Sequence, residues 1–144
     1  NDFSRSNIVV DHGNPAFVNG IIDFGDAVRT AVAVDVSTAL LNQLPVTPED
    51  DAFAAGRDLL RGYLAFADLT ADELAMIPHL TMGRAIARIL LSTWLARIFP
   101  QNARYILRNT PPSWWQLTWF LDRDPDAVRE NLLPPTATDL SSRG

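Results

Sequence analysis

The chain has 144 residues, of which 47% are hydrophobic and 20% are charged, a composition typical of one compact domain and not of a disordered tail. Its net charge of -5, with arginines scattered singly along the chain, argues against nucleic acid as a partner. The absence of cysteine excludes disulfides and thiolate metal sites, and the lack of a long apolar run or a signal-like start predicts a soluble, cytoplasmic protein with no membrane partner.

The first predicted element is a β-hairpin. Residues 8–11 form a short β-branched run, residues 12–15 are a turn cluster of His, Gly, Asn and Pro, and residues 17–22 are apolar again. Asp23, Phe24 and Gly25 come directly after them. A hairpin over this stretch brings its two ends together, so we expect the residues just before and just after it to be neighbours.

The remainder of the chain is predicted to be helical. Apolar residues recur at helical spacing over residues 36–44, a cap at Thr47 precedes a helix to about residue 66, and Thr70 with Glu73 forms a capping box. The helix that starts there is expected to kink or restart at Pro78 and to end before Pro100. Shorter helices are expected near residues 101–108, 113–121 and 125–132.

The long helix has apolar residues that we expect to face inward and arginines that we expect to face outward. The expected inward positions are Met82, Ile86, Ile89, Leu90, Thr93 and Leu95, and the expected outward positions are Arg84, Arg88 and Arg97.

Two short motifs flank the hairpin and carry complementary chemistry. Asp2 stands five residues before Asn7, which precedes the first strand, and Asp23 opens a D-F-G triplet after the second strand. Kinase-type phosphoryl transfer needs an Asp near the attacking hydroxyl, an Asn on a metal and a further Asp bridging metal and phosphates. The hairpin would let Asn7 and Asp23 share one Mg²⁺, which favours oxygen ligands, and would leave Asp2 to orient the acceptor hydroxyl.

These motifs resemble the aminoglycoside phosphotransferase and choline kinase superfamily. The matching stretches are NDFSRSNIVVD, GIIDFGDA and DVSTAL within the first 44 residues, and GIIDFGDA with a helical continuation is similar to hydroxylysine kinase-like members. The resemblance implies that Asp2 is the catalytic base, that Asn7 and Asp23 bind Mg²⁺ and the nucleotide, and that Asp35 supports the catalytic loop. Asp26 is either a further supporting acid or the N-cap of the next segment.

The resemblance also implies a fold and a domain organisation. We expect a mainly α fold with an N-terminal β-hairpin, equivalent to the C-lobe of a protein-kinase-like phosphotransferase, over residues 1–133. Residues 1–28 would hold the catalytic loop, the hairpin and the DFG-type segment, residues 31–133 the helical part, and residues 134–144 a flexible tail. The implied activity is ATP-dependent phosphorylation of a hydroxyl on an aminoglycoside, an amino alcohol or a hydroxy amino acid.

The sequence departs from the family pattern in two ways. The His of the family's H-x-D motif would lie one position before Asn1, and the chain contains no Lys that could pair with the phosphates. We therefore expect the chain to be inactive without an N-lobe, and the fragment could form a homo-oligomer. A non-catalytic domain that binds metal, nucleotide or protein is the alternative.

Other candidate residues favour structural roles. His12 is expected in a solvated turn and His79 in a partly buried position, so a histidine metal site is not supported. The Trp cluster could form a cage for a cationic substrate, although core packing is the favoured interpretation; it comprises Trp114, Trp115 and Trp119.

Overall fold

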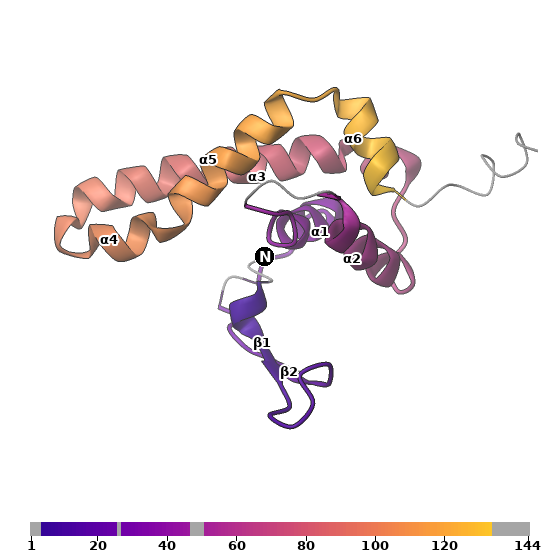
Figure 1. The fold of residues 1–144 in the computed structure, drawn as a ribbon, viewed down its shortest axis with the longest axis horizontal. Helices are drawn as coiled ribbons and strands as arrows, with labels where there is room; N and C mark the ends of the chain where they lie inside the picture. Colours follow the sequence, from indigo (N-terminus) through magenta and orange to yellow (C-terminus); the bar gives the residue numbers. More distant parts are fainter. Residues whose placement is uncertain (1–3, 26, 47–50, 134–144) are drawn as a thin grey trace, which may run out of the picture.

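The computed structural model describes residues 4–25, 27–46 and 51–133. A short hairpin projects from a body made of helices (Figure 1). Its elements in chain order are a 3₁₀ turn at Arg5–Asn7, β1 (Ile8–Val10), β2 (Val18–Ile21), α1 (Val32–Leu41), α2 (Ala54–Leu64), α3 (Ala71–Ile98), a 3₁₀ turn at Pro100–Asn102, α4 (Ala103–Ile106), a 3₁₀ turn at Leu107–Asn109, α5 (Thr110–Leu121) and α6 (Pro125–Leu132). The mainly helical architecture and the two-stranded antiparallel sheet confirm that part of the predicted fold, while the equivalence to a kinase-like C-lobe stays a prediction.

The hairpin is closed by a turn that the sequence dictates locally. The Asp11 carboxylate accepts hydrogen bonds from the backbone N–H groups of Gly13 and Asn14 at 2.8 and 2.9 Å, as Asp does in turns. The strands pair antiparallel with Ile8 opposite Ile21, and an irregularity follows Val9. The register brings the residues that precede β1 beside those that follow β2.

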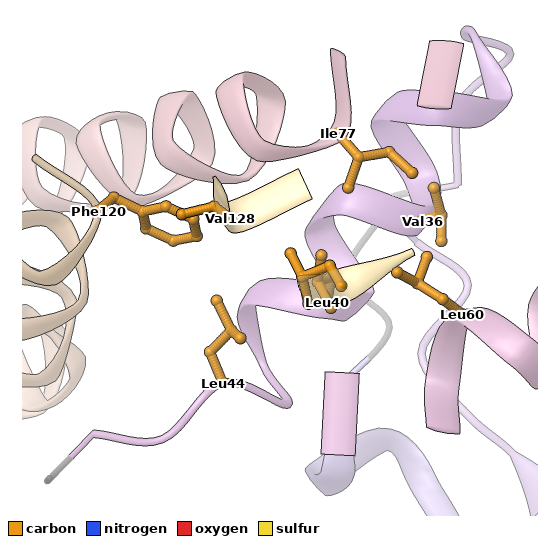
Figure 2. Packing of buried hydrophobic residues seen from close by; sticks show 8 residues of the cluster. Val36, Leu40, Leu44, Leu60, Ile77, Phe120 and Val128 are labelled. Atoms are coloured by element: carbon orange, nitrogen blue, oxygen red, sulfur yellow. The ribbon is translucent and has the colours of Figure 1, made fainter. Parts of the chain in front are cut away.

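The larger of two buried clusters in the described helical body joins aliphatic and aromatic side chains from α1 and the turn after it, α2, α3, α5 and α6. Figure 2 shows these side chains pointing toward one another. The buried members are Val36, Leu40, Leu44, Leu60, Ile77, Phe120, Val128 and Leu132. Burial of each such side chain contributes about 1.5–3 kcal/mol, so this cluster is the main source of stability in the described residues.

A buried polar side chain completes the end of α1. Gln116 of α5 is 3% exposed, and its Nε2 donates to the carbonyl oxygens of Leu41 and Leu44 at 3.0 and 3.1 Å. The last carbonyls of a helix have no partner within the helix. Gln116 therefore satisfies the C-terminus of α1 from a helix 75 residues away in sequence.

The start of α3 confirms the predicted capping box. The Glu73 backbone N–H donates to the Thr70 hydroxyl at 3.2 Å, and the Thr70 backbone N–H donates to the Glu73 carboxylate at 2.8 Å. The bonds from Thr70 lower the pKa of Glu73, because they favour its charged form. The predicted cap at Thr47 and the predicted tail over residues 134–144 lie outside the described residues.

The expected restart at Pro78 is wrong, because α3 is continuous from Ala71 to Ile98, while the expected kink stays a prediction. Proline inside a helix costs about 3 kcal/mol. Ile77, Pro78 and Thr81 are all buried, and this packing offsets the cost.

Three of the six expected inward positions on α3 are also wrong. Ile89 is buried, but Ile86 is 39% exposed, Leu90 is 63% exposed, and Thr93 is exposed too. The buried face runs through Ile77, Thr81, Ala85 and Ile89 instead. The error has a physical cause: α3 carries apolar residues on all sides, so periodicity does not single out one face.

Helix α3 is also unusually long and apolar compared with the other helices of the described residues. Among the described residues it is the one helix long and apolar enough to cross a membrane, a test that core helices of soluble proteins also pass. Its buried face packs against α1 and α5.

Candidate functional site

The two ends of the hairpin meet at one place, as the motif spacing predicts. The backbone N–H of Ile22 donates to the carbonyl oxygen of Asn7 at 2.9 Å, one step beyond the Ile8 and Ile21 pair. Asn7, with 8% exposure, is buried, and its Oδ1 accepts a hydrogen bond from the Ser6 hydroxyl at 3.4 Å. The hairpin therefore holds Asn7 next to the segment that begins at Asp23.

The backbone of Asp23 is in an unusual conformation. Its φ is 64°, and it is the one residue other than glycine with positive φ in the part of the chain that the structure describes. The left-handed region is uncommon for non-glycine residues, and such strained positions cluster at functional sites. This residue stands directly before Phe24 and Gly25.

A cavity of about 700 Å³ opens between the hairpin and the first two helices. Asn7 and Asp23 line it from the hairpin side, while Asp35 of α1 and Asp58 and Tyr63 of α2 line it from the helical side. This volume is in the range of small-molecule sites. Its described lining contains three Asp side chains and no Arg or His, so the cavity is suited to a ligand with positive charge.

Asp35 and Tyr63 join α1 to α2 across the cavity wall. The Tyr63 hydroxyl donates to Oδ2 of Asp35 at 3.3 Å. Burial of the phenol and the neighbouring negative charge of Asp35 raise the pKa of Tyr63. Tyr63 therefore remains a hydrogen-bond donor in the cavity at neutral pH.

The side-chain oxygens of Asn7 and Asp23 at the hairpin end are suited to Mg²⁺. A carboxylate and an amide oxygen are hard ligands, and Mg²⁺ in kinase sites takes few protein ligands and completes its shell with water and phosphate. In the described residues, no three His, Cys, Asp or Glu side chains are grouped as a metal cluster. Asn7 and Asp23 are the side chains at this end of the cavity whose oxygens could hold such an ion.

The two histidines lie at the surface. His12 is exposed in the hairpin turn, as predicted. His79 is exposed as well, so the partly buried position expected for it is wrong. Its neighbour Pro78 is on the buried face of α3, and the next residue along the helix points away from that face.

The predicted site residues divide into two groups. Asn7, Asp23 and Asp35 line the same cavity, while Asp2 and Asp26 lie outside the described residues. The support of the catalytic loop by Asp35 stays a prediction.

Two further residues of the cavity wall, Asp58 and Tyr63, have no signal in the sequence that marks them as part of a site. Apolar spacing predicts only an inward position for Tyr63, and it predicts nothing for Asp58. Both belong to α2, which packs beside the hairpin through tertiary contacts that no local spacing encodes.

The Trp cluster lies away from this cavity. Trp119 makes edge-to-face contacts with Phe53 and Phe120 at ring-centroid distances of 5.1 and 5.2 Å, and the Arg123 guanidinium stacks 4.0 Å from its centroid. Trp114 is 54% exposed. For Trp119, core packing is the better description.

Comparison with curated proteins gives distant relatives over most of the chain. The chain is 24% identical to hydroxylysine kinase from Mus musculus and 22% identical to hydroxylysine kinase from Bos taurus, over 135 residues in each case. Both alignments cover 90% of this chain and 35% of the relative, so the chain spans about a third of the length of these proteins. No solved structure matches the chain.

The chain also matches a model of a whole protein family. The model described as the phosphotransferase enzyme family, APH, matches residues 1–76. These residues include the hairpin, α1, α2 and the described lining of the cavity. The match covers more than half of the 144 residues, and the chain therefore belongs to the APH phosphotransferase family.

Proposed function

We propose that this chain carries the metal-binding and acceptor-binding half of an ATP-dependent kinase that phosphorylates a hydroxyl group on a small molecule. The observation that carries the proposal is the shared cavity, which has Asn7 and Asp23 at one side and Asp35, Asp58 and Tyr63 at the other. Membership of the phosphotransferase family supports the reaction class.

In this proposal Asn7 and Asp23 hold Mg²⁺ through their side-chain oxygens. When bound, the metal neutralises charge on the nucleotide phosphates. Asp2, five residues before Asn7, accepts a hydrogen bond from the acceptor hydroxyl and orients it toward the phosphate, and positioned acid or base groups of this kind contribute about 10²–10⁴-fold. As the hydroxyl oxygen bonds to the γ-phosphorus of ATP, the bond from that phosphorus to the bridging oxygen breaks and ADP leaves, while the hydroxyl proton passes to the Asp2 carboxylate.

The acceptor in this proposal also carries a positive charge. Asp35 and Asp58 place carboxylates in the cavity wall, and Tyr63, whose hydroxyl donates to Asp35, adds an acceptor oxygen and an aromatic ring. An aminoglycoside, an amino alcohol or a hydroxy amino acid combines an ammonium group with a hydroxyl. The name of the mouse relative, hydroxylysine kinase, agrees with this acceptor class.

The site can be tested with Mn²⁺ as a spectroscopic substitute for Mg²⁺. Binding of Mn²⁺ to the chain, alone and with ADP, is measured by electron paramagnetic resonance for the wild type, Asp23→Asn and a matched control, Asp68→Asn. Asp68 is an exposed acid outside the cavity lining, so its loss should leave binding unchanged. Asp23→Asn should weaken Mn²⁺ binding by roughly tenfold or more, as loss of a charged ligand does.

Two outcomes would count against this function. Equal Mn²⁺ affinity of wild type and Asp23→Asn would show that Asp23 is not a metal ligand. Mn²⁺ and ADP binding that depends on Asp23, together with no phosphorylation of any amine-bearing alcohol by a chain that includes the family's N-lobe, would favour a non-catalytic nucleotide-binding domain.

A further inference from the structure

Helix α3 presents an apolar stripe on the face opposite to its core contacts. The buried face contains Ile77, Thr81, Ala85 and Ile89. On the other side Met76 is 49% exposed, Leu90 is 63% exposed, and Trp94 is 58% exposed. Exposed apolar side chains aligned along one helix mark an interaction surface more often than a solvated one.

The spacing of the stripe is that of a helix-packing seam. Met76, Leu80, Gly83, Ala87, Leu90 and Trp94 are separated alternately by four and three residues, the pattern by which one helix packs along another. The middle of the seam carries its smallest side chains, Gly83 and Ala87, and a Cβ added at Gly83 would meet only open space. Large residues at both ends and small residues in the middle let a second helix approach closely.

The seam is symmetric about Ala85 in a way that matches a second copy of itself. In an antiparallel pair of α3 helices centred there, Met76 of one copy faces Trp94 of the other. By the same symmetry, Leu80 faces Leu90, and Gly83 faces Ala87. We propose that the chain self-associates through this stripe as an antiparallel, two-fold symmetric α3 pair.

The charges on α3 favour the same arrangement. No Asp or Glu occurs from residue 74 to residue 121, a stretch that carries five Arg. The acids of α3 are Asp72 and Glu73 in its first turn, and Arg97 lies in its last turn. An antiparallel pair brings Asp72 of one copy near Arg97 of the other, on the same edge of the seam, whereas a parallel pair would place both acidic first turns at one end and both Arg97 residues at the other.

Self-association can be measured by sedimentation equilibrium at a chain concentration of about 100 µM, which populates a dimer with a micromolar dissociation constant. The wild type should be dimeric. Gly83→Arg should be monomeric, because the added side chain keeps the second helix at a distance and places a charge in an apolar seam. Gly62→Arg is the matched control: it changes a helical glycine of α2 that also has open space around it, and it should remain dimeric.

The antiparallel register has its own test, since the chain has no cysteine of its own. Leu80→Cys and Leu90→Cys are prepared separately and oxidised alone or as an equal mixture. In the antiparallel pair two copies of residue 80 lie about 15 Å apart along the axis, too far for a disulfide. Only the mixture should therefore give a cross-linked dimer, and circular dichroism shows whether each variant is folded.

Several results would overturn the proposal. They are a monomeric wild type, a Gly83→Arg variant that is folded and still dimeric, and disulfides within single-variant samples. A monomeric chain that binds vesicles containing phosphatidylserine through the same residues would assign the stripe to a lipid surface instead.

Discussion

The hairpin and the helical body of this protein differ in how deeply their apolar side chains are buried. In the hairpin Val9, Val18 and Ile21 are 42%, 53% and 46% exposed, whereas Leu40, Leu60 and Leu132 of the body are fully buried. A two-stranded hairpin is at best marginally stable by itself. Asn7 and Asp23, which we propose as metal ligands, nevertheless lie at the ends of the hairpin.

Because of this difference, we expect the helical body to supply most of the stability and the hairpin to supply the proposed metal-binding residues. The helical core holds the second wall of the cavity, with Asp35 and Tyr63, in a fixed place. The hairpin brings the two proposed metal ligands, Asn7 and Asp23, to the first wall through backbone pairing and the positive φ of Asp23. Mutations in the body should therefore change stability, and mutations in the hairpin should change ligand binding with little effect on stability.

The largest effect is expected from Leu40→Ala. Leu40 is fully buried at the centre of the cluster in Figure 2, and such truncations cost about 2–5 kcal/mol of unfolding free energy. Urea denaturation followed by circular dichroism gives the value. Phe66→Ala is the control, because Phe66 is 96% exposed and its loss should cost less than about 0.5 kcal/mol. Equal costs for the two variants would contradict the placement of Leu40 in the core of the body.

A smaller loss is expected from Gly56→Ala. A Cβ at Gly56 would lie 2.9 Å from Cδ1 of Leu40 and 3.0 Å from Cδ2 of Leu132, where α2 packs closely against α1 and α6. Overpacking of this kind costs about 1–3 kcal/mol, partly offset by up to about 1 kcal/mol of helix propensity gained from alanine. Net destabilisation in the same urea assay is the expected result, and a stabilised variant would show that the two leucines move freely.

The contact between α1 and α2 should make stability fall at alkaline pH. The pKa of Tyr63 is raised above its usual value of 10.0, so its contribution is present below that value and is lost as pH rises through the folded-state pKa. Thermal unfolding between pH 8 and pH 11 should show a smaller alkaline loss for Tyr63→Phe than for the wild type. Identical pH profiles of unfolding for the two proteins would show that Tyr63 does not cause the loss of stability at alkaline pH.

The smallest effect on stability is expected in the hairpin itself. Val9→Thr keeps a β-branched side chain at a position that is 42% exposed, and surface changes of this kind lie within about 0.5 kcal/mol. Mn²⁺ affinity is the more informative readout, since Val9 pairs with Gly20 close to both metal ligands. A loss of more than about 1 kcal/mol in unfolding free energy would show that the hairpin is part of the cooperative core.

Local signals in the sequence predicted local structure well. The turn cluster of residues 12–15 indicated the hairpin, and Thr70 with Glu73 indicated the start of α3. The motif spacing indicated the meeting of Asn7 with the segment that contains Asp23. Each depends on residues that are close in the chain or joined by a short hairpin.

Features set by packing over long distances were missed. Pro78 lies inside α3 because its surroundings are buried, and Leu90 is exposed because α1 and α5 cover the other face. The positions of Asp58 and Tyr63 in the wall of the cavity depend on how α2 packs, which no pattern within α2 reveals. Gln116 at the end of α1 is a further case, with 75 residues between donor and acceptor.

The central claim is that the hairpin brings Asn7 and Asp23 to one metal, and paramagnetic broadening by Mn²⁺ in a ¹⁵N-labelled sample tests it most directly. Substoichiometric Mn²⁺ should first broaden the amide signals of residues 6–8 and 22–24, and Asp23→Asn should remove this effect. Broadening confined to acids of the helical body, such as Asp58 or Asp126, or broadening that survives Asp23→Asn, would contradict the claim.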